Sequence, residues 1–165
     1  MLTTKFPKGG PALAIATAAS LVLLSTSAAF AAGAVSVTET FHDATMSFPA
    51  INPCNGDVGT VALTYNGVAH ATFLTSGNAA GTGHATFTAT GDFVFTPDDP
   101  ARVSYSGHLT AWDGENANLQ NYAATSTFVV HATGADGSTL TYHDVAHFNV
   151  SASGVTISFD KPSCG

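Results

Sequence analysis

The sequence predicts an all-β domain: an antiparallel up-and-down meander of about eight to nine strands that closes into a small barrel. Polar and apolar residues alternate with a period of two in stretches such as 35–41, 84–90 and 103–112. Thr, Val and Phe dominate these stretches, and such residues suit a pleated, half-buried surface. Short turn sequences separate the stretches, which favours strands that each follow directly on the last. A two-sheet β-sandwich is the alternative architecture.

The expected strands follow from these alternating stretches and from the turn residues between them. Turn chemistry is found at Asn66-Gly67, at Gly91-Asp92, in 98–100 and in 135–137. Barrel closure would remove exposed strand edges that could otherwise aggregate. We expect strands at 35–43, 58–65, 68–75, 84–90, 93–97, 103–112, 122–133, 139–148 and 154–159.

The first 31 residues are typical of a signal peptide. Lys5 and Lys8 precede an apolar run over 12–24, and small residues lead to an A-x-A cleavage site that ends at Ala31. A second possible cleavage site ends at Ala34. The apolar run makes only about 20 Å of helix, whereas the hydrocarbon core of a membrane is about 30 Å thick. We therefore expect a secreted, extracellular protein, with a single domain over 32–165 and no membrane contact after cleavage.

The charge of the chain excludes nucleic acid as a partner. The formal net charge is −7, and it becomes −9 beyond residue 31, where all eleven acids but only two of the four bases lie. Nucleic-acid binding needs clustered Lys and Arg that neutralise phosphates. The two cysteines, Cys54 and Cys164, fit export, because an oxidising compartment allows them to form a disulfide.

Two expected hairpins place aromatic residues and histidines on one face. A two-residue turn at Asn66-Gly67 would put His70 on the same face as Leu63 and Tyr65. A two-residue turn at Gly91-Asp92 would likewise put His84 with Phe93 and Phe95. If these faces point inward, the barrel lumen combines aromatic, hydroxyl and imidazole groups. The residues expected to line a ligand cavity are Tyr65, His70, His84, Phe93, Phe95 and Tyr105.

A third hairpin places the other histidines outside. A three-residue loop over 135–137, with Gly137 in a left-handed conformation, pairs Val130 with Tyr142 and leaves His131 and His143 on the opposite face. These two histidines are diagonal neighbours and are weak candidates for binding zinc or copper. No third ligand is evident nearby, so solvated strand positions are the preferred interpretation, and neither a resident metal nor a cofactor is expected.

Two acidic segments, 113–118 and the region around Arg102, could either bind a ligand or serve an ordinary structural role. The segment 113–118 places oxygen-bearing side chains at alternate positions, like the start of a calcium loop, but it lacks the Gly and the Glu that such a loop needs. We expect a solvated loop that could cover one mouth of the barrel. Arg102 follows Asp98 and Asp99, so a local ion pair is expected; the alternative is an anchor for an anionic ligand.

Several short motifs resemble a group of small exported actinobacterial proteins of unknown function. They are Asn52-Pro-Cys-Asn-Gly56, Tyr105-x-Gly-His-x-Thr-x-Trp112, the Gly137-Ser138 pair with its downstream His143-x-x-x-His147-Phe148, and the terminal Cys164-Gly165. In architecture, the expected barrel is similar to allene oxide cyclase and dirigent-type barrels, which guide apolar intermediates without a cofactor. No catalytic residue of those families can be matched here, and fold alone does not confer function.

The first functional hypothesis is a secreted, non-enzymatic β-barrel that binds a small, largely apolar molecule in its lumen. The second is a cofactor-free isomerase or cyclase in which His70 or His84 acts as acid or base. The third is a surface or matrix protein with weak histidine-mediated metal binding. The oligomeric state is not determined by the sequence.

Overall fold

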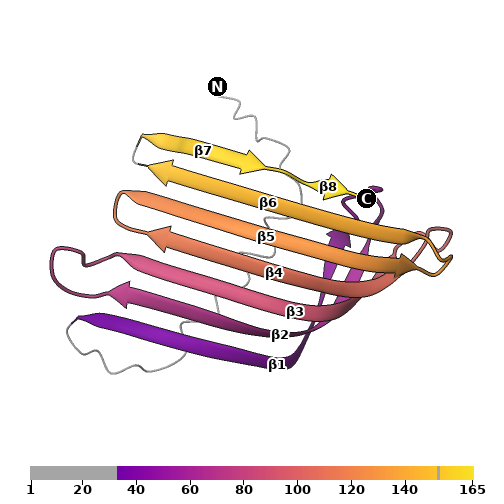
Figure 1. Ribbon diagram of the computed structural model, residues 1–165, viewed down its shortest axis with the longest axis horizontal. Helices are drawn as coiled ribbons and strands as arrows, with labels where there is room; N and C mark the ends of the chain where they lie inside the picture. The colour runs from indigo at the N-terminus through magenta and orange to yellow at the C-terminus, as the bar shows by residue number, and fades with distance from the viewer. Residues whose placement is uncertain (1–32, 152) are drawn as a thin grey trace.

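The structure, a computed structural model, describes residues 33–165 except residue 152. Each strand from β1 to β6 pairs antiparallel with the next one along the chain, and β8 also pairs with β6 (Figure 1). The predicted antiparallel meander is confirmed, and none of the described residues is helical. It follows that no helix in the described part of the chain could cross a membrane. The strands are β1 (Ala34–Ile51), β2 (Val58–Leu74), β3 (Gly83–Pro97), β4 (Tyr105–Ala117), β5 (Asn121–Gly134), β6 (Thr139–Ser151), β7 (Gly154–Asp160) and β8 (Ser163–Cys164).

Two of the predicted hairpin turns are wrong. Asn66-Gly67 lies in the middle of β2 and Gly91-Asp92 in the middle of β3, so each pair of expected short strands is one long strand. Neither glycine has the positive φ that a two-residue hairpin turn needs. A Cβ atom at Gly91 would lie 2.8 Å from the Cα of Tyr65, and one at Gly67 would lie 2.7 Å from the carbonyl oxygen of Thr88. These glycines therefore allow two strands to approach closely and do not form turns.

The missing turns change the side of the sheet on which two histidines lie. Side chains alternate between the two faces along a continuous strand, so His70 lies opposite to Leu63 and His84 lies opposite to Phe93. A two-residue turn would have reversed this relation. The prediction that His70 and His84 share a face with the aromatic residues is therefore wrong.

The third predicted hairpin is confirmed. Gly137, with φ of 84°, lies in the loop between β5 and β6. Val130 pairs with Tyr142 and Ala132 pairs with Leu140, as expected from a three-residue loop. This register fixes which side chains of β5 and β6 share a face.

The sheet has two chemically different faces. The inner face carries the core residues Phe93, Leu109 and Val130, and the outer face carries mostly Thr, Ser and His. Along β1 and β2 the alternation of half-buried and exposed residues is nearly unbroken. The outer-face histidines are His70, His84, His108, His131, His143 and His147.

A disulfide closes one end of the sheet. Cys54, in the loop between β1 and β2, is bonded to Cys164 in β8, with a Cα–Cα distance of 5.7 Å. The predicted disulfide is thus confirmed, and it joins the first loop of the meander to its last strand. β1 bends toward this contact at a bulge, where Asp43 has φ of 47° and its N–H donates to Asn66 Oδ1 at 3.0 Å. Figure 1 shows the second half of β1 turning across the sheet at this end.

The hydrophobic core lies inside this curled end. Its buried members are Phe93, Phe95, Leu109, Val130, Ala132 and Tyr142. Cys54 packs against the cluster, as do partly buried residues of β1 and β2. The disulfide therefore holds the first loop over the core, and burial of these apolar groups stabilises the curl.

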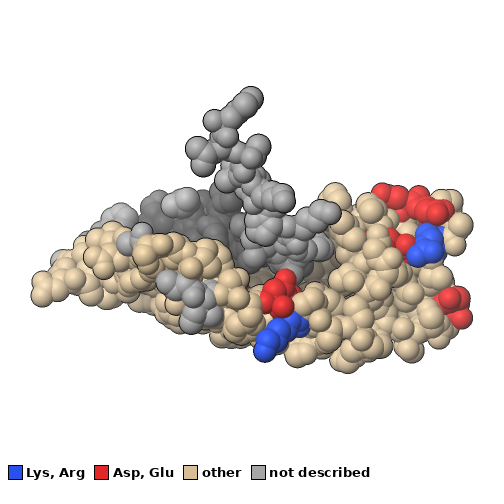
Figure 2. All heavy atoms as spheres, turned by 90° about the horizontal axis from the view of Figure 1, so that it is seen from above, with Lys and Arg blue, Asp and Glu red and all other residues tan. Residues whose placement is uncertain are grey.

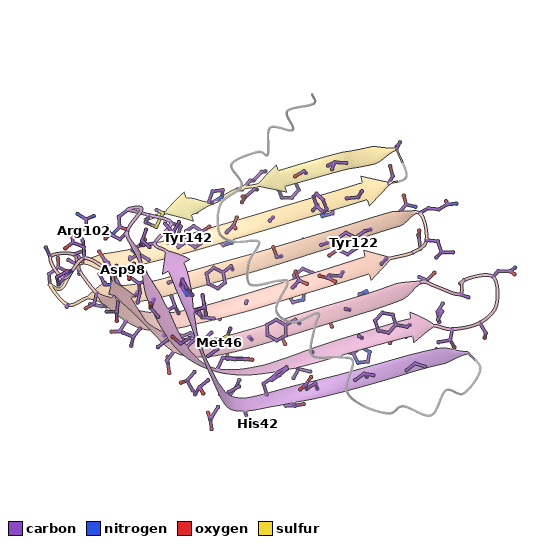
Figure 3. The ribbon with its side chains drawn as sticks, turned by 180° about the vertical axis from the view of Figure 1, so that it is seen from behind. His42, Met46, Asp98, Arg102, Tyr122 and Tyr142 are labelled. Carbon is purple, nitrogen blue, oxygen red and sulfur yellow. A yellow bond between two sulfur atoms is a disulfide. The ribbon has the colours of Figure 1, made fainter. Side chains whose placement is uncertain are left out.

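The opposite end of the sheet is open. No described residue of β1 pairs with β7, so the closure of a barrel is not seen. We call the part of the sheet beyond the bulge, away from the disulfide, the open half. In Figure 3, Tyr142 lies toward the disulfide end and Tyr122 lies in the open half.

Candidate functional site

Two aromatic clusters lie on the inner face of the open half and at its border with the core. Phe41 contacts Tyr65 and Phe87, with ring centroids 5.8 and 6.2 Å apart. On the other side of the sheet's centre, Tyr122 contacts Phe148 at 6.4 Å. Phe148 is 37% exposed, although it lies on the face that forms the core at the other end. We call these five residues the aromatic patch.

Small side chains lie between the two clusters. The register places Ala85, Ala89, Ala111, Ala124 and Ser126 there, on the inner face of β3, β4 and β5. Short side chains rise little above the sheet, whereas the aromatic rings on both sides rise further. The two aromatic clusters therefore flank a strip of small side chains on this face.

Two carboxyl groups stand among these small residues. Asp113 and Glu115 are on the inner face of β4, where Asp113 faces Phe87 on one neighbouring strand and Ser126 on the other. The predicted solvated loop over 113–118 is therefore wrong for these positions, because β4 continues to Ala117. Only Asn118 acts as a turn residue, its side-chain oxygen accepting from the N–H groups of Gln120 and Asn121.

Burial changes the titration of these groups. Burial, together with the smaller effect of the nearby Glu115 charge, raises the pKa of Asp113 to about 6. Burial also raises the pKa of Tyr122 well above its usual range, and a hydrogen bond to Glu115 acts in the same direction. Tyr122 therefore stays protonated and serves as a hydrogen-bond donor to Glu115.

A third inner-face carboxyl group lies at the border between the core and the open half. Asp144 of β6 is 2% exposed, and its Oδ1 atom has no hydrogen-bond partner. Burial raises its pKa, as does its contact with Asp160 of β7, because two carboxylates in contact repel. A buried oxygen without a partner is destabilising unless a proton or a bound group satisfies it.

The six residues predicted to line a cavity are divided among three places. Phe93 and Phe95 are 9% and 4% exposed and belong to the packed core, against which Tyr105 also packs. Tyr65 lies at the border of the core and belongs to the aromatic patch. His70 and His84 are on the outer face.

His70 and His84 each make a hydrogen bond to a side chain of a neighbouring strand. His70 Nδ1 is 2.8 Å from Thr38 Oγ1, and His84 Nδ1 is 2.9 Å from Asn116 Oδ1. His147 and Thr125 form a similar pair at 2.7 Å. Such cross-strand pairs stabilise a sheet, and they explain why histidines accompany threonines on this face.

The two candidate metal ligands, His131 and His143, are on the outer face as predicted. They are diagonal neighbours, since His131 faces Thr141 and His143 faces Val129. Within the described residues, no three His, Cys, Asp or Glu side chains are grouped so that they could hold a metal ion.

An open groove of about 1100 Å³ crosses the outer face beside His131. His108, which also lines it, already has partners on both ring nitrogens. Its Nδ1 is 3.0 Å from Asp92 Oδ1, and its Nε2 is 2.7 Å from Thr90 Oγ1. The lining of the groove combines hydroxyl-bearing residues with Met46, Leu63 and Val94, and the imidazole of His108 is held by Asp92 and Thr90.

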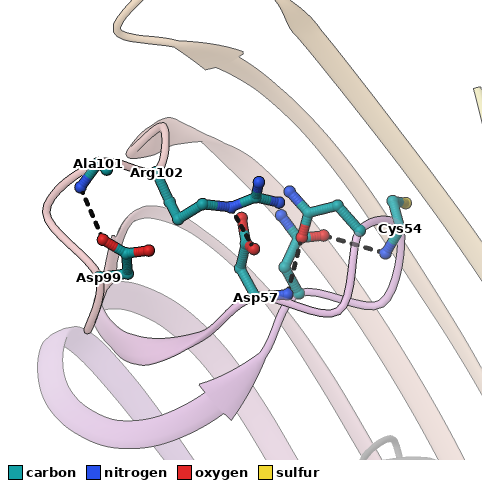
Figure 4. Close-up of polar contacts among 7 residues, drawn as sticks. Cys54, Asp57, Asp99, Ala101 and Arg102 are labelled. Carbon is teal, nitrogen blue, oxygen red and sulfur yellow. Dashed lines mark hydrogen bonds and ion pairs between the residues drawn. The ribbon is translucent and has the colours of Figure 1, made fainter.

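Arg102 forms an ion pair, but not with its neighbours in sequence. Its Nε donates to Asp57 Oδ1 at 2.7 Å (Figure 4). Asp99, one of the expected partners, instead accepts from the N–H of Ala101. The pair ties the β3–β4 connection to the β1–β2 loop at the disulfide end, where most of the charged side chains visible in Figure 2 gather.

Sequence reasoning missed Asp113, Glu115 and Asp144 as inner-face groups. The alternation along β4 could have revealed the two residues of that strand, since Leu109, Ala111, Asp113 and Glu115 are spaced two residues apart and therefore share a face.

Comparison of the chain with family models, with curated proteins and with solved structures gives no match.

Proposed function

We propose that this protein binds a small, largely apolar molecule on the inner face of the open half. The observation that carries the proposal is the aromatic patch, whose two clusters flank small residues on a face that the core does not fill. Binding sites for small molecules are mostly apolar and aromatic, with a few polar groups that fix orientation. Asp113, Glu115 and Tyr122 are such polar groups.

Export and barrel closure are parts of the same proposal. The disulfide between Cys54 and Cys164 is compatible with an extracellular location, because it persists in oxidising compartments. The cleavage sites after Ala31 and Ala34 border the start of β1, and residues 1–32 lie outside the described residues. Closure of the barrel would bring β1 and β7 together over a bound molecule and cover its apolar surface.

The alternative of an isomerase or cyclase loses its proposed acid and base. His70 and His84 are on the face opposite to the aromatic patch, so they do not reach a molecule bound there. The placement of these two histidines favours simple binding over catalysis by imidazole.

The test is titration of the disulfide-bonded protein with the neutral apolar dye Nile red. We expect saturable enhancement of dye fluorescence, and a loss of affinity of about tenfold for Phe41→Ser, because this substitution removes the ring that joins two members of the patch. Val68→Ser is the matched control, since Val68 is 41% exposed on the outer face of β2. Equal losses for both variants, or no saturable binding, would reject the proposal.

Barrel closure has its own measurement. Amide hydrogen exchange of the unpaired edge of β1 is compared with and without the bound dye. Closure predicts slower exchange at that edge on binding, whereas unchanged exchange would leave the sheet open in the complex and contradict this part of the proposal.

A further inference from the structure

We propose that the outer face of the sheet binds a neutral polysaccharide and that the indole ring of Trp112 is the platform on which a sugar stacks. This site lies on the face opposite to the aromatic patch, so the inference goes beyond the proposed function and does not depend on it. It is carried by the way the Trp112 ring lies, by the hydroxyl groups around the ring and by the charge of this face.

Trp112 lies flat against the sheet. It is on the outer face of β4, and a Cβ atom at Gly114 would lie 2.7 Å from Cη2 and 2.9 Å from Cζ2 of its ring. The ring therefore occupies the space that a side chain at residue 114 would need, which only glycine leaves free. One face of the indole is against the backbone, yet the residue is still 42% exposed. The other face of the ring is thus presented to solvent in a fixed orientation.

Threonine hydroxyl groups surround this ring. The positions opposite Trp112 and Gly114 on both neighbouring strands are all threonines: Thr86, Thr88, Thr125 and Thr127. Thr88 also lines a pocket of about 370 Å³ over β1, β2 and β3, together with Thr40 and Thr90. The platform therefore adjoins a hollow that carries further hydroxyl groups.

The charge of the outer face limits the classes of ligand that it suits. Among the described residues, no Lys or Arg belongs to a strand. Asp92 is the one acid of β2 to β5 on this face, and its carboxylate is 3.0 Å from His108. A nucleic acid, whose bases also stack on aromatic rings, needs basic residues for its phosphates. A wholly apolar ligand would cover the threonine hydroxyls without giving them partners.

A pyranose ring matches the remaining features of this face. Its C–H groups form an apolar surface that stacks on an aromatic ring, because the face of such a ring carries partial negative charge. Its hydroxyl groups donate and accept hydrogen bonds, as threonine hydroxyls do, so the two sets can pair around the platform. A chain of β-1,4-linked glucose presents such surfaces along a flat ribbon, which suits a ring that lies on a sheet.

The fluorescence of Trp112 reports directly on this site, because Trp112 is the only Trp in the chain. Cellohexaose is titrated into the disulfide-bonded protein, and hexagalacturonate, an acidic chain of the same length, is the comparison. We expect a saturable change in emission with cellohexaose and protection of the ring from quenching by acrylamide. Hexagalacturonate should bind about tenfold more weakly or less, because the formal net charge of the protein is −7.

Phe73 supplies a matched control for the role of the ring. It is 47% exposed, and it likewise covers a glycine, since a Cβ atom at Gly83 would lie 2.8 Å from its Cδ1. It lies on the inner face, where Val35 and Gly83 face it across the strands. Trp112→Ala and Phe73→Ala each uncover a glycine, but only Trp112→Ala should weaken the binding of cellohexaose, by about tenfold or more in calorimetric titration.

The hydroxyl groups are tested without changing the ring. The double variant Thr86→Val/Thr88→Val keeps the shape of both side chains, and it should weaken the binding of cellohexaose by about tenfold. Thr96→Val is its control, because Thr96 is exposed on the same face of β3, toward the disulfide end. The double variant keeps the inference testable if Trp112→Ala does not fold.

Each outcome supports or overturns the inference. Loss of binding in Trp112→Ala and in the threonine variant, with both controls unchanged, supports it. No saturable binding of cellohexaose, equal binding of hexagalacturonate, or equal losses in Trp112→Ala and Phe73→Ala would overturn it. Saturating cellohexaose should leave the affinity for Nile red unchanged, and competition between the two would overturn the separate site. Binding of cellohexaose without binding of the dye would reject the proposed function alone.

Discussion

At the scale of single residues, Asp113 makes stability depend on pH. Its pKa is raised to about 6 in the folded protein, from an ordinary value near 3.8. Between these values the folded state holds a proton that the unfolded state has lost, so the free energy of unfolding falls as the pH rises through this window. Above about pH 6 the ionised carboxylate is fully unfavourable. Asp113→Asn should therefore be more stable than the parent at pH 8 and nearly equal to it at pH 4, as measured by chemical denaturation.

Asp136 serves as a control, because its pKa is shifted in the direction opposite to that of Asp113. The hydroxyl and N–H groups of Ser138 donate to its carboxylate and lower its pKa. The resulting stability is present above the ordinary pKa and is lost as the pH falls, so Asp136→Asn should be less stable than the parent at pH 7. A higher stability of Asp136→Asn at pH 7, or an unchanged pH profile for Asp113→Asn, would contradict this assignment.

Gly91 is a residue where close packing excludes any side chain. A Cβ atom there would lie 2.8 Å from both the Cα and the Cβ of Tyr65. Gly91→Ala must push β2 and β3 apart, and we expect a loss of about 1–3 kcal/mol in the free energy of unfolding. Val94→Ala, on the exposed outer face of the same strand, should change it by about 0.5 kcal/mol or less. Similar losses for the two variants would rule out the steric explanation.

At the scale of strands, the sequence was informative where turn chemistry and alternation agreed. The loop at 135–137 has Gly137 in a left-handed conformation, so the register of β5 and β6 was predicted correctly and placed His131 and His143 outside. Inside β2 and β3, glycines next to Asn or Asp have the same local pattern as hairpin turns. The contact that explains Gly91 is made by Tyr65, 26 residues away in the sequence and across a strand boundary, so no local pattern reveals it.

The candidate site was only partly predictable for the same reason. Each wrongly predicted turn assigns the residues beyond it to the wrong face of the sheet, because side chains along a strand alternate between the two faces. Tyr65 was placed correctly on the inner face, whereas His70, beyond the false turn, was not. Asp113 and Glu115 fall in a predicted loop because the segment 113–118 resembles the start of a calcium loop. Their position in β4 is what makes them candidates for ligand recognition.

At the scale of the whole molecule, stability depends on a covalent link between the two ends of the meander. The disulfide from Cys54 to Cys164 spans 110 residues of sequence. In the chain-entropy model, a link of this length stabilises the folded state by about 4–5 kcal/mol. It also holds the β1–β2 loop over the core. The residues of the core project from a single sheet. The curled end should therefore open when the bond is absent.

The double variant Cys54→Ser/Cys164→Ser tests this dependence. We expect a loss of several kcal/mol in the free energy of unfolding by urea, with faster amide exchange in Phe93, Leu109 and Val130 of the core. Arg102→Ala is the control, because it removes the ion pair with Asp57 that joins loops at the same end. Solvent screens the half-exposed guanidinium of Arg102, so loss of this pair should cost much less stability than loss of the disulfide. If both variants lose equally little, the core alone maintains the curl, and the open half does not need the bond to present its aromatic patch.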